Sequence, residues 1–497
     1  MPRTQTCRAI SFALATCSIL ACSGELPPPP VKPEPHGGVA PADGTHLLDP
    51  SYGGDGSIGG FPVPVAFGQY AAVVTDRFDR VLIAGGKVHI SAQWDSDCRP
   101  TVIRIDSNGE FDTTFGDEGV ALGKGEFPGH ATGSSVSLDA FDRIIVTASV
   151  DPAETGIFEE SLVGAVFRFN DDGTADTTFG EGGRVLIESE HEDWTTGMVD
   201  AVADGSGRVL ILGIEREPVA SPGVLPVTHM FVARLLEDGS LDPSFGIGGI
   251  ARGPETESSS GAALVADMLG RPLVAGHVNR YDRDLAVWRF QADGLPDLSF
   301  GENPGGGMLL RSGPGGQQAT SLQGVDLALD SAGRVLVASN HATDIRRLDR
   351  WPLLKVWPVD DQEPIFDSIV WRLTSDGLKD PTFGFGGMRA VQISSVEGDH
   401  FDAATSLRVD PADGVVMAGY SAEPTWDAQF GFYTYAPSRV AVTRLTEAGA
   451  YDESFNGVGH ALLSEPRADG LALDSQGRLV LMGIGETVDA MSWRLTD

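Results

Sequence analysis

The sequence of 497 residues is poor in basic residues, in cysteine and in long apolar runs. It has 35 lysines and arginines against 70 aspartates and glutamates, so its formal net charge is −35. Nucleic-acid binders need a basic surface that neutralises phosphates, and this balance excludes that class. The same charge predicts repulsion from anionic lipid surfaces. Beyond the N-terminal segment no stretch approaches the roughly 18 uninterrupted apolar residues typical of a membrane-spanning helix.

Glycine and apolar residues, in contrast, are plentiful. Apolar residues make up 41% of the chain, too many for a disordered protein. Glycine accounts for 63 of the 497 residues, about 13%, against an average of roughly 7%. The composition therefore indicates an acidic, turn-rich globular protein, while helix signals are sparse.

Residues 1–21 have the pattern of an export signal. Arg3 and Arg8 precede an apolar run over residues 9–21, which is shorter than the roughly 20 residues that a membrane span needs. The motif Ile19-Leu20-Ala21-Cys22 resembles the bacterial lipobox. That resemblance implies cleavage before Cys22, diacylation of its thiol and, usually, acylation of the new N-terminus, which together give a stable anchor. Cleavage by the ordinary signal peptidase, with Cys22 unmodified, is the alternative.

Residues 22–47 form a proline-rich linker. Pro27 to Pro30 are consecutive prolines, and such runs favour an extended polyproline II conformation that cannot pack a core. Cys7 and Cys17 leave with the signal and Cys22 carries lipid, so only Cys98 remains and no intrachain disulfide is expected. We therefore expect an exported lipoprotein of the bacterial cell envelope, anchored in the outer membrane and held off it by this linker.

Two patterns recur in phase along the rest of the chain. The first is an aspartate, a short turn, usually an arginine, and an apolar run; it starts at Asp76, Asp139, Asp204, Asp267, Asp330, Asp410 and Asp474. The second is an apolar-Arg-apolar step followed by a turn and Asp-x-x-Phe-Gly; its phenylalanines are Phe115, Phe179, Phe245, Phe300, Phe383 and Phe455. The sixth unit departs from both patterns, because Gly414 replaces the arginine and Asn456 replaces the glycine after Phe455.

Each unit contains four short strand-like segments, and the two ends of the chain supply halves of one unit. The chain ends on Trp493-Arg494-Leu495-Thr496-Asp497, and the folded region begins with Leu48-Asp49-Pro50-Ser51-Tyr52-Gly53, the missing half with tyrosine in place of phenylalanine. Joining the two halves completes a seventh copy, as a closed ring requires. The sequence therefore predicts an all-β protein in which residues 48–497 form a seven-bladed β-propeller of four-stranded blades.

The segment Leu-Glu-Asp238-Gly239-Ser-Leu-Asp242-Pro-Ser-Phe245-Gly246 resembles the delta-60 repeat of bacterial cell-envelope proteins, and the resemblance covers residues 49–497. It implies a propeller-like fold but no established activity, cofactor or catalytic residues.

Residues that recur in every blade are expected to be structural, because an asymmetric substrate cannot use seven equivalent copies. The recurrent phenylalanines are predicted to wedge between neighbouring blades. A desolvated guanidinium must be paired. We therefore predict a repeated Arg–Asp clasp, for example Arg168 with Asp176 and Arg234 with Asp242, each pair eight residues apart.

The blades differ mainly in the loops between their second and third strands, all of which emerge on one face. Residues 340–367 of blade five and 421–438 of blade six are rich in aromatics, and residues 215–230 of blade three are poorer in them. Long loops on a rigid ring often carry binding residues. The candidate binding-face residues are Arg347, Trp351, Trp357, Trp426, Phe430 and Tyr433. Alternatively, these rings bury one another in a satellite core.

Signals for metals and catalysis are thin. His191 and His400 lie in acidic loops of blades three and six, which are not adjacent, and no Gly-x-Ser-x-Gly, His-Glu-x-x-His or Cys-x-x-Cys motif is present. We expect no cofactor and no metal, and a monomer that acts as a non-enzymatic binding or scaffold module for a protein or glycan. The alternatives are an envelope hydrolase or lyase with carboxylates at the ring mouth, and a structural spacer.

Overall fold

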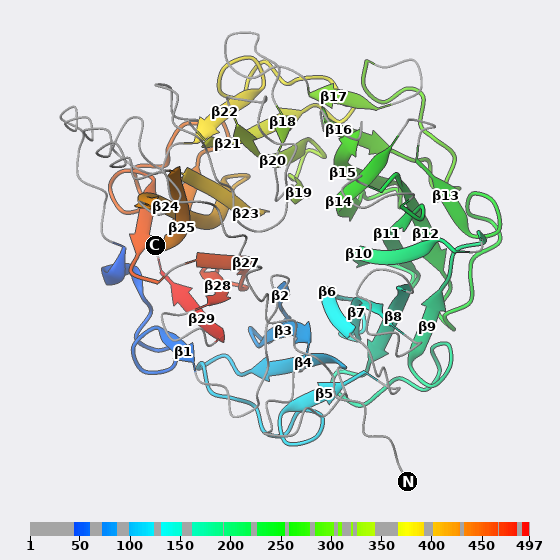
Figure 1. The fold of residues 1–497 in the computed structure, drawn as a ribbon. Coiled ribbons are helices and arrows are strands. Elements are labelled where there is room, and N and C mark those ends of the chain that lie inside the picture. The colour runs from blue at the N-terminus through cyan, green and yellow to red at the C-terminus, as the bar shows by residue number, and fades with distance from the viewer. Residues whose placement is uncertain are drawn as a thin grey trace, which may run out of the picture.

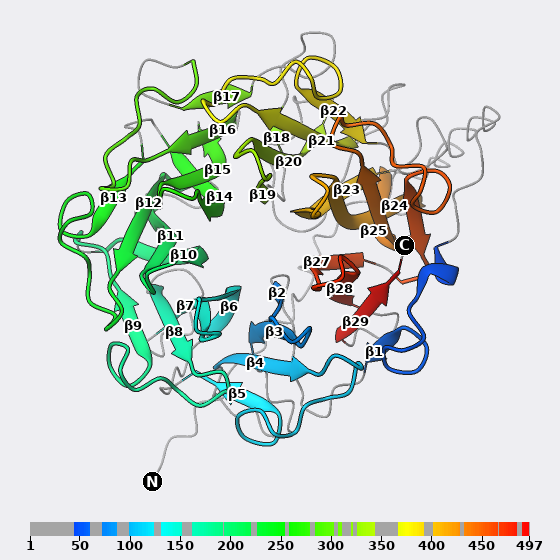
Figure 2. The ribbon, with the colours of Figure 1, turned by 180° about the vertical axis from the view of Figure 1, so that it is seen from behind.

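The computed structural model describes residues 44–59, 72–86, 99–123, 131–151, 162–191, 193–219, 226–253, 258–278, 284–302, 307–310, 320–321, 326–342, 366–391, 401–427, 432–465, 467–484 and 490–496. These residues form seven antiparallel four-stranded blades arranged in a ring (Figures 1 and 2). The predicted all-β, seven-bladed β-propeller is thus confirmed. Residues 1–43, including Cys22 and nearly all of the predicted linker, lie outside the described residues.

Within each blade the strands follow one another outwards from the ring axis (Figure 1). The innermost strands are β2 (Ala72–Thr75), β6 (Ala131–Leu138), β10 (Thr195–Ala203), β14 (Ser259–Ala266), the pair β18 (Thr320–Ser321) and β19 (Asp326–Leu329), β23 (Phe401–Val409) and β27 (Arg467–Leu473). The second strands are β3 (Val81–Gly86), β7 (Ile144–Val150), β11 (Val209–Arg216), β15 (Pro272–Val278), β20 (Val335–Ala342), β24 (Val415–Asp427) and β28 (Leu479–Ile484).

The third and outermost strands complete the blades. The third strands are β4 (Pro100–Ile105), β8 (Val163–Phe169), β12 (Thr228–Leu235), β16 (Asp284–Arg289), β21 (Phe366–Leu373), β25 (Phe432–Leu445) and β29 (Ala490–Leu495). The outermost strands are β5 (Val120–Leu122), β9 (Arg184–Ile187), β13 (Ile250–Arg252), β17 (Met308–Leu310), β22 (Met388–Val391), β26 (His460–Leu463) and β1 (Ser57–Gly59). Blade 1 comprises β2–β5, and the blades are numbered from it along the chain.

Blade 7 closes the ring as the sequence predicts. Its outermost strand β1 comes from the start of the folded region and pairs antiparallel with β29, with Ser57 opposite Trp493. A further bridge joins Leu48 to Leu495, and the Asp49 N–H donates to the Arg494 carbonyl at 2.8 Å. The first strand of the described region and the last strand therefore share one sheet, which closes the ring.

The apolar pattern explains the positions of the second strands. In β11 the residues Val209–Glu215 are all buried, because the strand has neighbours within its sheet and blades packed on both faces. Five innermost strands carry a β-bulge at the same place, for example between Met198 and Asp200 in β10. A bulge bends its strand and leaves the extra residue unpaired in the ladder.

The hydrophobic core consists of layers between adjacent blades. Each layer contains one of the recurrent aromatic rings, fully buried: Phe115, Phe179, Phe245, Phe300, Phe383, Phe455 and, between blades 7 and 1, Tyr52. Phe179, for example, packs with Ile145 and Val166 of blade 2 and with Val209 of blade 3. The predicted wedge between blades is therefore confirmed.

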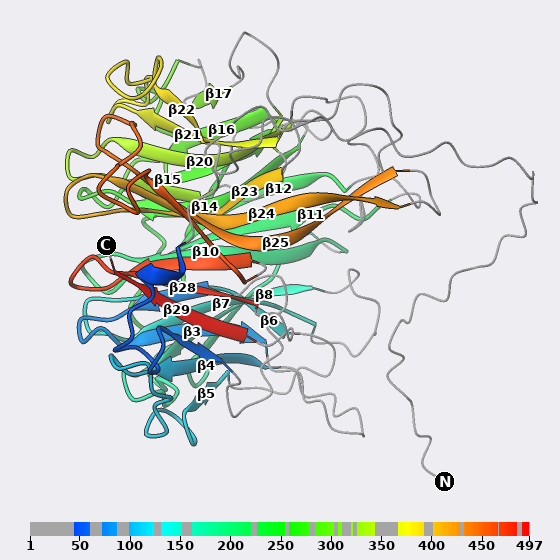
Figure 3. The same cartoon turned by 90° about the vertical axis from the view of Figure 1, so that its left-hand side faces the viewer.

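The ring has two unlike faces, seen edge-on in Figure 3. The turn face carries the short turns between first and second strands and between third and fourth strands. The loop face carries the connections between second and third strands and between blades. The only helix in the described segments is the short 3₁₀ helix η1 (Thr45–Leu47), whose Leu47 is buried between blades 6 and 7. None of the described segments forms a helix with the length and apolar character of a membrane span.

Candidate functional site

The recurrent arginines and aspartates form ion pairs on the turn face. In six blades the Nε of the third-strand arginine lies 2.8–2.9 Å from a carboxylate oxygen of the Asp-x-x-aromatic turn; the pairs are Arg104–Asp112, Arg168–Asp176, Arg234–Asp242, Arg289–Asp297, Arg372–Asp380 and Arg494–Asp49. The same guanidinium carbons lie 4.3–4.8 Å from the centre of the wedge ring. The predicted clasp is confirmed.

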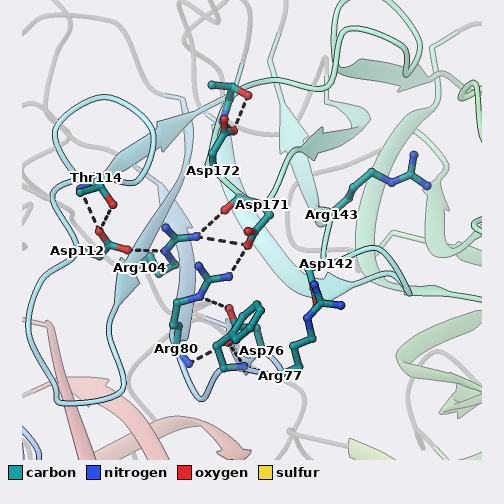
Figure 4. A network of polar contacts seen from close by, with 12 residues as sticks. Asp76, Arg77, Arg80, Arg104, Asp112, Thr114, Asp142, Arg143, Asp171 and Asp172 are labelled. Atoms are coloured by element: carbon teal, nitrogen blue, oxygen red, sulfur yellow. Dashed lines mark hydrogen bonds and ion pairs between the residues drawn. The ribbon is translucent and has the colours of Figure 1, made fainter.

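Most clasp arginines also join one blade to the next. The Nη1 of Arg104 donates to the Asp171 carbonyl of blade 2 at 2.5 Å (Figure 4). Four more arginines repeat this contact with the next turn; they are Arg234, Arg289, Arg372 and Arg494. The turns touch directly as well, since the Gly116 N–H donates to the Asp172 carbonyl at 2.7 Å. A Cβ on Gly173 would lie 2.7 Å from the Gly116 nitrogen, so this approach needs glycine.

A second arginine pairs with the anchor aspartate that ends each innermost strand. In blade 2 the Arg143 Nε lies 2.6 Å from Asp139 Oδ2, and equivalent pairs occur in blades 1, 3, 4, 5 and 7. Burial raises the pKa of Asp176, but hydrogen bonds from Thr178 and the charge of Arg168 outweigh it and hold that pKa below its ordinary value. These charged groups therefore serve the fold, and they leave no repeated catalytic set.

Non-repeated side chains gather at the loop-face end of blade 3. Trp194 lies just before β10, and its ring contacts two imidazoles. The ring centre of His191 lies 4.3 Å from that of Trp194, and the ring centre of His229 lies 5.1 Å from it, with the two ring planes at 13°. The His229 Nε2 lies 2.8 Å from Glu217 Oε1. Trp194 and His229 are half-buried and His191 is exposed. We call these four residues the blade-3 cluster.

Beside the blade-3 cluster lie charged side chains that are paired with one another. The buried Glu215 accepts a hydrogen bond from Ser189 at 3.0 Å and pairs with the half-exposed Arg252. A stack of rings with a carboxylate at its edge and a cation nearby can hold the flat face of a ligand and hydrogen-bond to its rim. Sequence reasoning considered His191 only as a metal ligand. The signal for the cluster was Trp194 itself, a non-repeated aromatic between two blades.

Two carboxylates stand out on the innermost strands. Asp200 of blade 3 and Asp326 of blade 5 occupy one position of the repeat, where the other blades carry alanine, serine or glycine. Asp200 accepts hydrogen bonds from Ser135 Oγ of blade 2 at 2.6 Å and from the Leu264 N–H of blade 4 at 2.9 Å. Asp326 accepts the Leu407 N–H of blade 6 at 2.7 Å.

The environment of Asp200 changes its acidity. Burial raises the pKa of Asp200 to about 6, against the hydrogen bonds from Ser135 and Leu264 that lower it, and the charge of Asp326 adds to the rise. Both carboxylates tie innermost strands of different blades together through serine hydroxyl and main-chain N–H donors. Asp200 can also exchange a proton near neutral pH, which a general acid or base requires.

The structure describes few of the candidate binding-face residues. Arg347, Trp351, Trp357 and Phe430 lie outside the described residues, as does His400. The backbones of Trp426 on β24 and Tyr433 on β25 are paired in register, on the long extensions of these strands at the loop face. Within the described ranges no group of three histidine, cysteine, aspartate or glutamate side chains is placed to hold a metal ion.

Comparisons with known proteins agree with the fold. Residues 224–245 match a family described as a domain of unknown function (DUF5122) β-propeller. No curated protein sequence matches the chain. Similar solved structures include an ulvan lyase of polysaccharide lyase family PL25 (8% identity, 88% of this chain and 96% of that one, TM-score 0.45) and the Hadza microbial sialidase Hz136 (11%, 81% and 74%, TM-score 0.39). An aldose sugar dehydrogenase from Streptomyces coelicolor is 12% identical over 72% of this chain and 92% of that one, with a TM-score of 0.35. At these TM-scores the likeness carries no argument about activity.

Proposed function

We propose that this protein is a binding or scaffold module of the bacterial cell envelope whose loop face takes a protein or glycan ligand. One observation carries the proposal: the recurrent charged residues are used up in links within and between blades, whereas the blade-3 cluster is not repeated and remains accessible. Aromatic rings on loops of a rigid scaffold are favoured contact residues. The module acts as a monomer, with no cofactor.

Export and anchoring complete this proposal. The signal over residues 1–21 directs the chain out of the cytoplasm, and lipid on Cys22 anchors it to the outer membrane. The prolines of residues 22–47 hold the propeller at a distance from the bilayer. A Cys22→Ser variant is expected to lose fatty-acid labelling and to leave the membrane fraction, and continued membrane retention would contradict the anchor.

The binding role is tested at Trp194. We expect Trp194→Ala to lose most of the capture of envelope glycans or proteins by the immobilised mature chain, measured by mass spectrometry of the retained fraction. Val219→Ala is the matched control, because Val219 is exposed on the same loop face but lies outside the blade-3 cluster. Equal capture by the wild type and Trp194→Ala would show that the binding site lies elsewhere on this face, and Trp426 and Tyr433 would be replaced next. If not even the wild type captures a ligand, the protein would be interpreted as a structural spacer.

An envelope hydrolase or lyase is the second candidate, favoured by the carboxylates Asp200 and Asp326 on the innermost strands of blades 3 and 5. Wild-type turnover of an envelope polysaccharide that Asp200→Asn abolishes, at unchanged unfolding midpoint, would favour this candidate. The present contacts favour binding, because both carboxylates already accept hydrogen bonds from main-chain and serine donors of adjacent blades.

A further inference from the structure

The exposed apolar side chains of the described residues gather on the turn face, opposite the blade-3 cluster. Eight of them belong to turns of three consecutive blades, 3, 4 and 5; they are Leu241, Ile247, Met268, Leu269, Leu295, Leu298, Leu378 and Phe385. Ile247 is 90% exposed and Phe385 is 86% exposed. Exposed apolar surface of this extent, rimmed by polar groups, marks interaction sites on soluble proteins.

The fold does not require apolar residues at these positions. The residue after Phe-Gly is Ile247 in blade 3 and Phe385 in blade 5, but Asp117, Glu181 and Glu302 in blades 1, 2 and 4. The same turn geometry is therefore compatible with a charged side chain there. The apolar residues of blades 3 and 5 are departures from the repeat that contribute nothing to the packing between blades.

Six of these eight residues lie in the turns between the third and fourth strands of blades 3, 4 and 5 and form one arc. Main-chain contacts hold the turns of successive blades together: the Gly246 N–H donates to the Asp293 carbonyl at 2.6 Å, and the Gly301 N–H donates to the Asp376 carbonyl at 2.8 Å. Ile247 adjoins the first contact and Leu378 lies near the second. We call Leu241, Ile247, Leu295, Leu298, Leu378 and Phe385 the turn-face arc; Met268 and Leu269 lie in the turn between the two inner strands of blade 4, β14 and β15.

The charges around the arc are almost all of one sign. The turns at residues 236–248, 291–302 and 374–387 carry five exposed acids, which are Glu237, Asp238, Asp293, Glu302 and Asp376. Their only basic residue is Lys379, whose ammonium lies 5.0 Å from the centre of the Trp371 ring. From outside these turns, Arg143 of blade 2 pairs with Glu237 at 3.3 Å, and the other four acids form no ion pair among the described residues. Hydrogen bonds from Ser240 lower the pKa of Asp238, so this carboxylate is charged at neutral pH.

We propose that the turn-face arc docks a basic amphipathic segment of a partner protein, with apolar side chains on the arc and lysines or arginines against its acidic rim. Charge complementarity selects this occupant. A second copy of the chain would bring two acidic rims together, and an anionic lipid surface would meet the same repulsion. With a ligand on the loop face, the ring would join two partners across its thickness.

The experiment uses the mature chain and a model helical peptide with leucines at i, i+3, i+4 and i+7 and lysines elsewhere. Fluorescence anisotropy reports its affinity for the wild type and for the double variant Ile247→Glu/Phe385→Glu. We expect the variant to bind the peptide at least about tenfold more weakly than the wild type, as for the loss of central apolar contacts. The variant is expected to fold, because blades 1, 2 and 4 carry acids at this position.

The sign of the charge change makes this test sharp. The double variant is more acidic than the wild type, so attraction of a cationic peptide to net charge alone would strengthen binding. Phe141→Ser is the matched control, since Phe141 is exposed on the turn face outside the arc, and it is expected to leave binding unchanged. Equal or tighter binding by the double variant would overturn the proposal.

Three further readouts bear on the occupant. Binding of the matching leucine–glutamate peptide as tightly as the lysine peptide would overturn the charge argument. A wild-type dimer in sedimentation that the double variant dissociates would assign the arc to a second copy instead. Capture by phosphatidylcholine vesicles that the double variant abolishes would assign it to a lipid surface instead. A monomer that ignores vesicles and binds only the basic peptide supports the proposal.

Discussion

Blades 2 and 6 each pair two aspartates of the turn face with arginine, but they use different numbers of arginines. Blade 2 has one arginine for each aspartate, Arg143 on Asp139 and Arg168 on Asp176. Blade 6 has Gly414 in the first position, and the guanidinium of Arg444 covers both carboxylates, with Nη2 at 3.0 Å from Asp410 Oδ2 and Nε at 3.3 Å from Asp452 Oδ2. Gly414 donates its N–H to Asp410 Oδ1 at 2.8 Å, and its carbonyl accepts the Asp410 N–H at 2.9 Å.

The difference shows that the repeat conserves paired carboxylates more strictly than it conserves the pairing cations. A buried carboxylate left without a partner is costly, whereas the long arginine side chain can reach either of two sites a few ångströms apart. In blade 2, by contrast, it is an arginine that has polar atoms without hydrogen-bond partners in the described part of the chain. Arg168 is fully buried, and its Nη1 and Nη2 have no hydrogen-bond partner among the described residues. Burial and the neighbouring Arg143 lower the pKa of Arg168.

The largest expected effect is the difference in stability lost when Arg444 or Arg168 is replaced. Arg444→Met removes the guanidinium shared by two carboxylates and should lower the free energy of unfolding by about 3 kcal/mol. Arg168→Met should cost only about 1 kcal/mol, because Arg143 Nη1 still lies 3.8 Å from Asp176, whereas blade 6 has Gly414 in place of that second arginine. Urea titrations of both variants, followed by circular dichroism, measure the difference. Equal losses, or a larger loss for Arg168→Met, would contradict the sharing of Arg444.

Much of this turn-face network could be predicted from the sequence. The clasp follows from the constant eight-residue spacing between arginine and aspartate, and the wedge follows from the recurrence of the phenylalanine. Ring closure follows from Tyr52 and Trp493 lying in two halves of one motif. These features repeat within a blade, so seven copies report the same local geometry.

Contacts that depend on the rotation between blades could not be predicted. The spacing in sequence does not show that Arg104 reaches the Asp171 carbonyl, nor that Arg444 turns to Asp410 when Gly414 replaces the arginine. Asp200 looks like one polar residue in an alternating strand until its partners on blades 2 and 4 are seen. The repeat pattern does not distinguish Ile247 and Phe385 from other apolar residues of the blades, and only the structure shows that both are exposed.

A smaller effect should restore the blade-2 arrangement in blade 6. Gly414 has no positive φ, so an arginine is compatible with its backbone, although a Cβ there would lie 2.6 Å from Asp410 Oδ2 and requires that carboxylate to shift. In the Arg444→Met background, Gly414→Arg should recover about 1–2 kcal/mol, since it supplies the partner that Arg143 supplies to Asp139. In the wild type it should change stability much less. A double-mutant cycle measures this coupling, and additive effects would place the loss in Arg444→Met elsewhere than at Asp410.

The smallest expected effect concerns Asn456, the other departure of blade 6. Asn456 and its counterpart Gly180 share a φ of 52°. At Gly180 a Cβ would lie 2.2 Å from the Arg184 carbonyl oxygen, whereas the Asn456 amide donates to the equivalent His460 carbonyl at 2.9 Å. Asn456→Gly loses that hydrogen bond but relieves the left-handed backbone, so it should cost about 0.5 kcal/mol. Asn456→Ala loses the bond and keeps the backbone strain, so it should cost about 1–2 kcal/mol. A lower urea midpoint for Asn456→Gly than for Asn456→Ala would contradict the argument from left-handed backbone strain.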